Sequence, residues 1–457
     1  MVQSELPNDY RKAFKGADIR GEYPAEIDES LVYRVAYYLV TRHSISTVAV
    51  ARDMRLSSPS LMQALKAGVR DAGADVLDLG LVPTPVLYFA SGTRDVWGIM
   101  ITASHNPASY NGLKIVQPGA VPLTERTGLR DIKKAIRTEP KPTSRRGGQR
   151  SASVLASYVQ TMHKRAPVVT GASTLRVVAD AGNGMASHML QAAKKYWPVE
   201  LTIINADLDG SFPSRASNPM LRKNQKPIRE ALKTGRYDMG VAFDGDGDRV
   251  AFFDASGRMI NSAVIGALIA EEALAQHPKA SCVYTVFTSR IYEDVIRQSG
   301  GRPVRAKVGH SFIKEKMRQS DAVFGCEHSG HFYFKDNYYA DSSMLACQYV
   351  FAACEHHGLS LSTLAKRYEQ YHQTEEVLVE VVDKTATLEA CAQQYQTVPG
   401  VSINRFDGVS VTTPEYWFTL KPSVTEDALK YVVEASTKKK ASQVQTELAQ
   451  FLSAHKK

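Results

Sequence analysis

Runs of apolar residues alternate with polar segments along the chain, and three stretches repeat one order of elements. In each stretch an apolar strand is followed by a polar loop, a helical pattern and a second strand. The expected strands cover residues 47–51 and 74–79, 175–179 and 199–204, and 282–286 and 303–306, with helices over residues 61–72, 186–196 and 292–298. This alternation predicts layered α/β structure, and its recurrence at intervals of about 110–130 residues predicts three related domains.

The pattern changes in the last part of the chain, where a smaller α+β domain is expected. Its expected elements are strands over residues 375–382 and 417–420 and helices over residues 386–395 and 427–434. Residues 139–148 are rich in Pro, Lys, Arg and Gly, which predicts a linker, and a second break is expected near residues 254–257. The predicted domain boundaries are therefore 1–150, 151–255, 256–373 and 374–457.

Composition narrows the class of protein. The 457 residues are 44% hydrophobic and 23% charged, which is typical of a globular protein. No run of about 20 apolar residues predicts a membrane span, and the polar N-terminus does not resemble a secretory signal. Five cysteines without a C-x-x-C pair favour the reducing cytoplasm. The net charge of +9 includes the lysine run 438–440, but no aromatic residues are interleaved with it, so a solvated surface is favoured over nucleic-acid binding.

A run of three aspartates is the sharpest local feature. Asp244, Asp246 and Asp248 alternate with two glycines after an apolar strand expected over residues 239–243, and Arg249 follows them. Three carboxylates this close need a positive partner, and an all-oxygen ligand set favours Mg²⁺ or Ca²⁺. The loop lacks the Gly at position 6 and the Glu at position 12 of an EF-hand. The alternative interpretation is a solvated acidic turn.

A serine loop follows another apolar strand, expected over residues 97–101. It contains T-A-S-H-N-P at residues 102–107, with Ser104 and His105 adjacent, and Asn111-Gly112 further on is typical of a turn. Adjacent Ser and His side chains usually point apart, which argues against a hydrolase triad. From these residues alone, a phosphorylation site and an ordinary polar loop both remain open.

Two more polar loops carry candidate binding groups. The sequence G-C-E-H-S-G-H at residues 325–331 offers a carboxylate, a hydroxyl and imidazoles that could bind sugar hydroxyls, although an ordinary turn is an equal alternative. The sequence K-P-S-V-T-E at residues 421–426 lies before the expected helix over residues 427–434. Hydroxyl and N–H groups at a helix start favour phosphate binding, and a plain helix cap is the alternative.

Taken in order, these four loops resemble those of the α-D-phosphohexomutase family. That family carries a TASHNP serine loop, a DGDGDR metal loop, a GE-x-SGH sugar loop and a phosphate loop of the PSGTEP or PSNTEP type. The segment A-D-I-R-G at residues 17–21 is similar to the family's YDIRG element. The resemblance covers nearly the whole chain. It implies a four-domain phosphohexomutase architecture of three related α/β domains with mixed sheets and a smaller C-terminal α+β domain.

The resemblance also implies a role for individual residues. Ser104 would be phosphorylated in the active enzyme and would share Mg²⁺ with the three aspartates. The implied catalytic residues are Ser104, Arg20, His105, Lys114, Arg249, His310 and His331. The implied metal ligands are Ser104, Asp244, Asp246 and Asp248. The implied substrate-binding residues are Glu327, Ser329, Lys421, Ser423 and Thr425.

On this resemblance we predict a cytoplasmic phosphomannomutase that interconverts mannose 1-phosphate and mannose 6-phosphate, with glucose phosphates left open as further substrates. A hexose 1,6-bisphosphate would be the intermediate and activator, and small hexose phosphates would be the only partners. The sequence carries no indication of an oligomeric state. A phosphoglucosamine mutase, a catalytically weak sugar-phosphate-binding paralogue and a simple phosphatase are the alternatives. The paralogue is suggested by three departures in the phosphate loop, which are Lys421, Val424 and Asp427, and Ala17 is a further departure from the family motifs.

Overall fold

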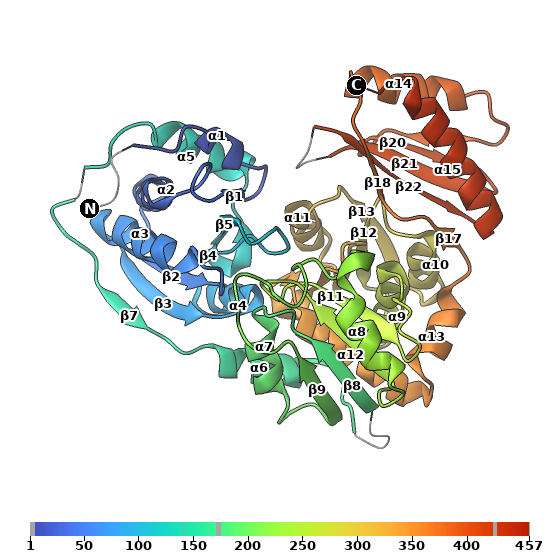
Figure 1. Ribbon diagram of the computed structural model, residues 1–457, viewed down its shortest axis with the longest axis horizontal. Helices are drawn as coiled ribbons and strands as arrows, with labels where there is room; N and C mark the ends of the chain where they lie inside the picture. The colour runs from blue at the N-terminus through green and yellow to red at the C-terminus, as the bar shows by residue number, and fades with distance from the viewer. Residues whose placement is uncertain (1–4, 142, 171–174, 424–426, 457) are drawn as a thin grey trace. The chain divides into compact units, whose positions relative to one another are not determined.

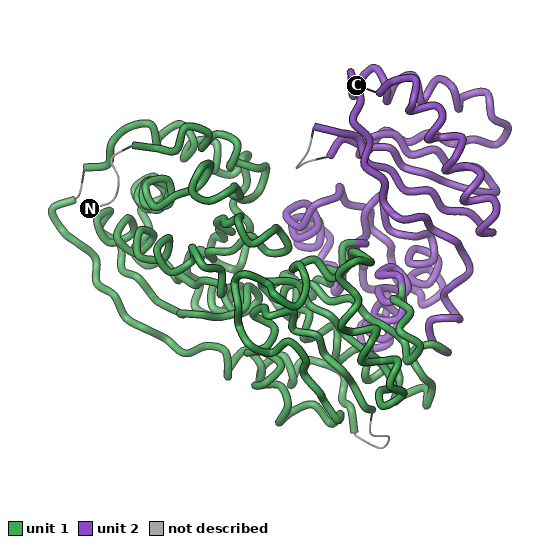
Figure 2. The backbone as a smooth tube through the Cα atoms, in the orientation of Figure 1, with its two compact units in different colours: residues 1–260, 329–362 green, residues 261–328, 363–457 purple. Residues whose placement is uncertain are grey.

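The computed structural model describes residues 5–141, 143–170, 175–423 and 427–456. The chain forms two compact units, shown in different colours in Figure 2. Unit 1 comprises residues 1–260 and 329–362, and unit 2 comprises residues 261–328 and 363–457. The helices and strands of both units are labelled in Figure 1. The four predicted domain boundaries stay a prediction.

The first sheet of unit 1 is mixed and has the strand order β1-β5-β4-β2-β3-β7, with the short β6 paired to β5. Strands β2, β3, β4 and β7 are parallel, whereas β5 runs antiparallel to both of its long neighbours, β1 and β4. The strands are β1 (Ile19–Glu22), β2 (Thr47–Arg52), β3 (Asp75–Leu81), β4 (Trp97–Ile101), β5 (Tyr110–Gln117), β6 (Val121–Pro122) and β7 (Gln149–Ser151). The helices are α1 (Tyr10–Ala13), α2 (Glu29–His43), α3 (Ser58–Asp71), α4 (Thr84–Arg94) and α5 (Leu129–Ala135).

The second sheet of unit 1 has the order β11-β10-β8-β9, with β8 parallel to β9 and β10 and with an antiparallel hairpin between β10 and β11. Its strands are β8 (Leu175–Asp180), β9 (Val199–Ile204), β10 (Met239–Phe243) and β11 (Val250–Asp254). The other elements are α6 (Leu155–Arg165), α7 (Ala186–Ala193), α8 (Lys226–Lys233), the hairpin β15 (Phe332–Phe334) and β16 (Ala340–Asp341), and α12 (Ser343–His357). Every residue of β10 is buried, as expected for an interior strand with an unbroken apolar run.

Unit 2 contains three parallel strands, with β12 between β13 and β14, and an antiparallel C-terminal sheet of order β17-β22-β21-β20-β19. The parallel strands are β12 (Ser281–Thr285), β13 (Arg302–Ala306) and β14 (Phe324–Cys326), with helices α9 (Ser262–Gln276), α10 (Arg290–Gln298) and α11 (His310–Ser320). The C-terminal strands are β17 (His372–Gln373), β18 (Val377–Val379), β19 (Ser402–Asn404), β20 (Val409–Thr412), β21 (Tyr416–Pro422) and β22 (Leu429–Ala435). The remaining helices are α14 (Lys384–Tyr395) and α15 (Lys438–Ser453), together with α13 (Leu361–Tyr368), which spans the unit boundary. Four 3₁₀ turns lie in unit 1, and they are η1 (Pro118–Ala120), η2 (Glu125–Thr127), η3 (Arg222–Asn224) and η4 (Lys335–Asn337).

The core explains why these elements pack as they do. In unit 1, Leu31 and Val35 of α2, Leu65 of α3, and Val48 and Ile99 of the first sheet belong to one buried cluster, so both helices cover the same face of that sheet. In the C-terminal part of unit 2, side chains of α14 and α15 share another buried cluster with strands β20 to β22. Among the described residues, no helix combines the length and the apolar character that a membrane crossing requires.

Most of the predicted strands and helices are confirmed, and three local predictions are wrong. The helix expected over residues 427–434 is instead strand β22, whose Tyr431, Val432 and Val433 have high strand propensity and whose whole length pairs with β21. The strand expected over residues 375–382 is reduced to the three residues of β18. The helix expected to reach residue 196 ends at Ala193.

The turn expected at Asn111-Gly112 is also wrong, because both residues lie inside β5, where they pair with β1. Gly112 is required here by a close approach between strands. A Cβ at this position would lie 2.3 Å from the Ile19 carbonyl oxygen and 2.8 Å from that of Thr102. Glycine therefore marks a tight backbone contact at this site and not a reversal of the chain.

Candidate active site

The serine loop begins where β4 ends. Ser104 is buried, with 1% of its surface exposed, and it adopts the left-handed conformation with φ of +49°. A non-glycine residue in this region costs on the order of 1 kcal/mol and persists only where its surroundings hold it. The Ser104 hydroxyl donates a hydrogen bond to Asp244 Oδ2 at 2.8 Å, although the two residues are 140 positions apart. The serine loop and the aspartate loop, which follow carboxyl ends of strands in two different sheets, therefore meet.

Two glycines allow this meeting. A Cβ on Gly245 would lie 2.6 Å from the Ser104 carbonyl oxygen, so a side chain there would push the loops apart. Gly247 has φ of +73°, which turns the backbone so that the N–H groups of Gly247 and Arg249 both donate to Asp244 Oδ1. As a result, one carboxylate oxygen from each of the three aspartates lies within 4.8 Å of the other two.

Lys114 on β5 supplies the positive charge that the aspartates need. Its ammonium group contacts Asp246 Oδ2 at 2.8 Å and also Asp248 Oδ2, and all three side chains are buried. Burial, together with the charges of Asp248 and Asp246, raises the pKa of Asp244 well above its ordinary value. Burial also acts to raise the pKa of Asp248, but Lys114, His331 and Arg249 outweigh it and hold that pKa well below the usual range.

The aspartate loop fits a divalent cation. Asp246 Oδ1 and Asp248 Oδ1 are buried without a hydrogen-bond partner in the described part of the chain, which is a costly arrangement unless another group binds them. Among the described residues, these three aspartates are also the one group of His, Cys, Asp and Glu side chains close enough to hold a metal ion. Hard carboxylate oxygens favour Mg²⁺, Ca²⁺ or Mn²⁺ over softer metals. The sequence prediction of a metal site at this loop therefore has geometric support.

Arginine and histidine side chains surround the same serine. Arg20 on β1 donates to the Asn106 side chain at 2.9 Å, and Arg249 donates through Nε to His331 Nε2 at 3.2 Å. His331 Nδ1 lies 3.0 Å from Ser329 Oγ, and His105 Nδ1 lies 3.5 Å from Ser104 Oγ. The side chains of Ser104 and His105 thus lie on the same side, contrary to the expectation that they point apart.

The charge state of His105 follows from this crowding. Burial first, and then the neighbouring cations Arg249 and Arg20, hold the pKa of His105 well below its ordinary value. The imidazole is therefore neutral at physiological pH and keeps a lone pair for a hydrogen-bond donor.

The remaining predicted residues lie in unit 2. Glu327 follows β14 and is buried, and His310 is the first residue of α11. Lys421 on β21 is nearly buried, and its ammonium group contacts Asp407 Oδ2 at 2.8 Å. The same Asp407 oxygen accepts the Val308 N–H at 2.9 Å.

Two predicted phosphate-binding residues follow β21. The backbone N–H of Ser423 donates a hydrogen bond to Ala428 O at 2.9 Å, which fixes the start of this loop. Thr425 lies outside the described residues. Because the helix expected after this loop is a strand, a helix N-terminus contributes nothing to phosphate binding here.

A separate ion-pair cluster fixes His328, the residue after Glu327. His328 Nε2 lies 3.0 Å from Glu376 Oε2, and Lys430 of β22 lies 3.0 Å from Glu376 Oε1. Burial raises the pKa of Glu376, but His328 and Lys430 outweigh this effect and lower it to about 2.

The lowered pKa of Glu376 predicts how the free energy of unfolding depends on pH. A carboxyl whose folded pKa is depressed stabilises the fold above its unfolded pKa, and the contribution, on the order of 3 kcal/mol at most, is lost as pH falls from about 4.5 towards 2. We expect Glu376→Gln to flatten this part of the acid unfolding curve of the full chain, followed by circular dichroism. The control is Glu389→Gln, because Glu389 of α14 is an exposed glutamate that pairs with Arg405. Identical acid limbs for wild type and Glu376→Gln would contradict the prediction.

Sequence reasoning missed three buried residues that hold the two loops. Thr84, at the start of α4, donates through Oγ1 to Asp246 Oδ2 at 2.6 Å. Arg215 pairs with Asp180 at 2.5 Å and donates to Phe243 O at 2.7 Å, at the end of the strand that precedes the aspartates. Arg55 follows β2 and binds the serine loop. None of the three belongs to one of the four motifs. The one available indication was that Arg55 and Thr84 come soon after the ends of β2 and β3, and Arg215 had none.

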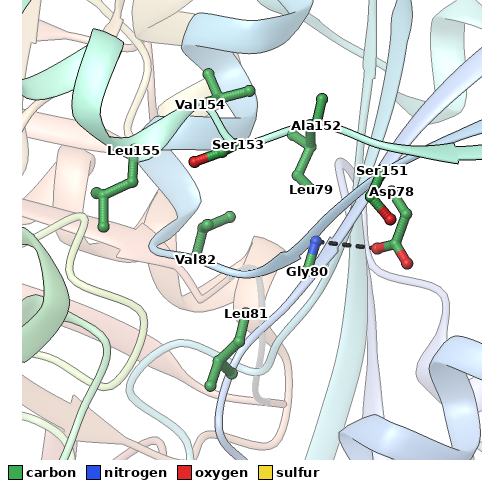
Figure 3. Close-up of a pocket in the computed structure, with 10 residues that line it drawn as sticks. All are labelled: Asp78, Leu79, Gly80, Leu81, Val82, Ser151, Ala152, Ser153, Val154 and Leu155. Atoms are coloured by element: carbon green, nitrogen blue, oxygen red, sulfur yellow. Dashed lines mark hydrogen bonds between the residues drawn. The ribbon is translucent and has the colours of Figure 1, made fainter.

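A cavity of about 370 Å³ in unit 1 lies elsewhere on the chain, lined by residues 78–82 and 151–155 (Figure 3). Its one charged side chain, Asp78, is already engaged with Lys66 and with the Gly80 N–H, the second of these drawn in Figure 3. No lining residue is a cation, so the cavity offers no charge partner for a phosphate.

Comparisons with known proteins agree with this fold and site. Three family models match in order, described as phosphoglucomutase/phosphomannomutase alpha/beta/alpha domain I at residues 11–143, domain II at residues 156–257 and domain III at residues 261–371. A phosphomannomutase from Escherichia coli is 35% identical over 92% of this chain and 94% of its own length. The phosphohexose mutases of Xanthomonas campestris are 33% identical with the same coverage.

Solved structures give the same result. A phosphoglucomutase/phosphomannomutase family protein from Burkholderia thailandensis superimposes with a TM-score of 0.87 at 30% identity, covering 99% of this chain and 98% of that one. The fold and the relatives together define an isomerase of the mutase type. The chain belongs to the phosphoglucomutase/phosphomannomutase family. The predicted family, enzyme class and fold class, with three α/β domains and a further C-terminal domain, are confirmed.

Proposed function

We propose that the chain is a phosphomannomutase that interconverts mannose 1-phosphate and mannose 6-phosphate through a phosphorylated Ser104 and a hexose 1,6-bisphosphate. The observation that carries this proposal is the 2.8 Å hydrogen bond between the Ser104 hydroxyl and Asp244 inside a buried ring of carboxylates and cations. Relatives of the same length that are named phosphomannomutases support the choice of sugar.

In the proposed cycle, the phosphoryl group of Ser104 passes to the free hydroxyl of the sugar phosphate. The bond from phosphorus to Ser104 Oγ breaks, the bond from phosphorus to the sugar oxygen forms, and the sugar hydroxyl gives up its proton. After the bisphosphate turns over, its other phosphoryl group returns to Ser104, so the bond from phosphorus to that sugar oxygen breaks and the bond from phosphorus to Ser104 Oγ forms. The Ser104 hydroxyl loses its proton towards Asp244 Oδ2, which already accepts its hydrogen bond, and the released sugar oxygen takes up a proton.

The positive side chains of this site would offset the charge of the transferring group. Arg20, Lys114 and Arg249 would lie around the phosphoryl oxygens, where fixed charges in a buried site are most effective. Asp244, Asp246 and Asp248 would hold Mg²⁺, which supplies further stabilisation of the negative charge when it is bound. His105 and His331 would contribute hydrogen bonds at the serine loop.

The unit 2 residues are proposed to bind the rest of the substrate. Glu327, with Ser329 of unit 1, would bind sugar hydroxyls that both orientations of the bisphosphate present. Lys421, Ser423 and Thr425 would bind the phosphate that does not react, and His310 would contribute an imidazole. The ammonium group of Lys421 has three N–H donors, so its contact with Asp407 leaves donors for a phosphate.

The proposal is tested by following mannose 1-phosphate with Mg²⁺ and a catalytic amount of mannose 1,6-bisphosphate. We expect mannose 6-phosphate to form without release of inorganic phosphate. We also expect kcat/KM for mannose 1-phosphate to exceed that for glucosamine 1-phosphate by about tenfold or more, a difference of about 1.4 kcal/mol. Preference for the amino sugar would instead support a phosphoglucosamine mutase, stoichiometric phosphate release would indicate a phosphatase, and binding without turnover would indicate the weak paralogue.

The proposal also covers the location of the enzyme in the cell and its binding partners. All five cysteines are buried and free of disulfides, which supports the proposed cytoplasmic location. Small hexose phosphates are the proposed partners, without nucleic acid or membrane.

A further inference from the structure

Arg55, three residues beyond the end of β2, is the most completely buried arginine near the serine loop, with no exposed surface. All four of its terminal N–H groups donate to backbone carbonyls of the segment that contains Ser104. The acceptors are the carbonyl oxygens of Ser104 at 2.9 Å, Asn106 at 2.7 Å, Pro107 at 2.6 Å and Tyr110 at 2.9 Å. One guanidinium group therefore binds the backbone of the whole loop.

The cost of burying this charge argues that the arrangement is specific. Arg55 forms an ion pair with Asp53, whose Oδ2 lies 3.2 Å from Arg55 Nε. Asp53 is itself held by Ser58 Oγ at 2.6 Å and by the Arg55 N–H at 3.0 Å. A buried ion pair contributes little to stability compared with apolar residues of similar size, so its presence calls for another role.

The loop needs such a partner because of its conformation. Ser104 is in the left-handed region, so its carbonyl turns away from any strand ladder and must be satisfied elsewhere. The Ser104 carbonyl oxygen accepts from Arg55 and faces Gly245, where a Cβ would lie only 2.6 Å away. Arg55 thus fixes the carbonyl that lies directly between the serine loop and the aspartate loop.

The segment that follows β9 covers Arg55 from the other side. The Phe212 ring lies 5.2 Å from the guanidinium carbon, and a Cβ on Gly210 would lie 2.7 Å from the Arg55 Cα. Ser217 Oγ donates to Asn106 O at 3.0 Å, the same oxygen that accepts from Arg55. Phe212 therefore covers the guanidinium group of Arg55, and Ser217 reinforces one of the carbonyls that Arg55 binds.

We propose that Arg55 is a positioning residue that sets the conformation of Ser104 through four backbone carbonyls and so aims its hydroxyl at Asp244. It touches neither the substrate nor the transferring phosphoryl group. The consequence for turnover rests on the proposed function, whereas the consequence for the loop does not. A lysine cannot replace it, because one ammonium group cannot reach four divergent carbonyls in a planar array.

The experiment compares Arg55→Ala, Arg55→Lys and Arg34→Ala in the full chain. Arg34 is a matched control, because it is also buried in unit 1 and donates to backbone carbonyls, those of Ile136 at 3.0 Å and Thr138 at 3.3 Å. We expect Arg55→Ala to lower kcat about 100-fold, Arg55→Lys about tenfold, and Arg34→Ala less than about threefold. KM should change little in all three variants. Millimolar guanidinium should restore part of the kcat of Arg55→Ala and none of that of Arg55→Lys.

A second measurement needs no turnover. Amide hydrogen exchange of residues 103–110 in the unphosphorylated protein should be about tenfold faster in Arg55→Ala and unchanged in Arg34→Ala. Faster exchange in a protein whose wild type lacks mutase activity would support the positioning role and count against the proposed function. The positioning role is overturned if Arg55→Ala keeps wild-type exchange and kcat, or if Arg34→Ala loses as much kcat as Arg55→Ala.

Discussion

Replacing Ser104 by alanine is expected to lower mutase turnover by about 10⁴-fold or more, equivalent to about 5.5 kcal/mol of transition-state stabilisation. The reason is chemical. Without Oγ there is no oxygen to carry the phosphoryl group between the two halves of the proposed cycle, and phosphate monoesters exchange extremely slowly without a catalyst. The measurement is conversion of mannose 1-phosphate, together with the intact mass of the protein, which should lack the phosphate carried by wild type.

Ser109→Ala is the matched control for this substitution. Ser109 belongs to the same loop but is exposed, and its backbone oxygen accepts a hydrogen bond from the Tyr23 N–H. We expect Ser109→Ala to keep wild-type turnover. Substantial activity in Ser104→Ala, with a phosphate still present by mass, would place the phosphoryl carrier on another residue and would remove the basis of the proposed cycle.

Several strands of the α/β parts could be predicted from the sequence because their apolar or β-branched runs are dense. Residues 97–101, 199–204 and 239–243 were predicted with the bounds that the structure has. Strands β4 and β10 are interior and largely buried, whereas β9 lies at the edge of its sheet and was found from its β-branched residues. The hydrophobic pattern is sufficient in such cases.

The errors arose where tertiary contacts override local preference. Residues 429–435 mix Leu, Lys, Glu and Ala, which suit a helix, with the strand-forming Tyr431, Val432 and Val433, and seven paired positions with β21 decide for a strand. Asn111-Gly112 has the composition of a turn, yet Gly112 serves a close approach to Ile19 and Thr102. No local pattern distinguishes these outcomes, because the deciding partner lies on another strand.

In the candidate site, too, some residues could be predicted from the sequence and others could not. Ser104 and the three aspartates could be found because each motif keeps its chemical groups within a few residues. Arg55, Thr84 and Arg215 could not, because each acts on a backbone carbonyl or a carboxylate from a different part of the chain. Motifs therefore identify the groups that do chemistry, whereas the residues that position them emerge only from the folded structure.

The charges around Asp244, Asp246 and Asp248 favour binding of a cation at this loop. Asp246 accepts Lys114 and Thr84 at Oδ2, while its buried Oδ1 has no hydrogen-bond partner in the described part of the chain. The pKa of Asp244 is raised by burial and by the charges of Asp248 and Asp246, so the loop without a cation carries unfavourable carboxylate repulsion. One carboxylate less should relieve that repulsion and weaken cation binding at the same time.

Asp246→Asn is therefore expected to lower mutase turnover by about 10³-fold and Mg²⁺ affinity by about 100-fold. Binding of a cation to the folded state alone stabilises it by RT ln(1 + [L]/Kd), about 2.7 kcal/mol at 100 times Kd. Mg²⁺ should thus raise the melting temperature of wild type and leave that of Asp246→Asn nearly unchanged, whereas without Mg²⁺ the two proteins should melt within a few degrees of each other.

Asp238→Asn provides the comparison, since Asp238 is a partly exposed carboxylate in the same unit that pairs with Arg176. It should keep both the turnover and the Mg²⁺ response of wild type, because it is not among the three carboxylates that cluster. If Asp246→Asn were stabilised by Mg²⁺ as strongly as wild type, the cation would bind elsewhere. Lys114 would then be left to offset the crowding of the buried carboxylates, and Asp246 Oδ1, which has no hydrogen-bond partner among the described residues, would need another explanation.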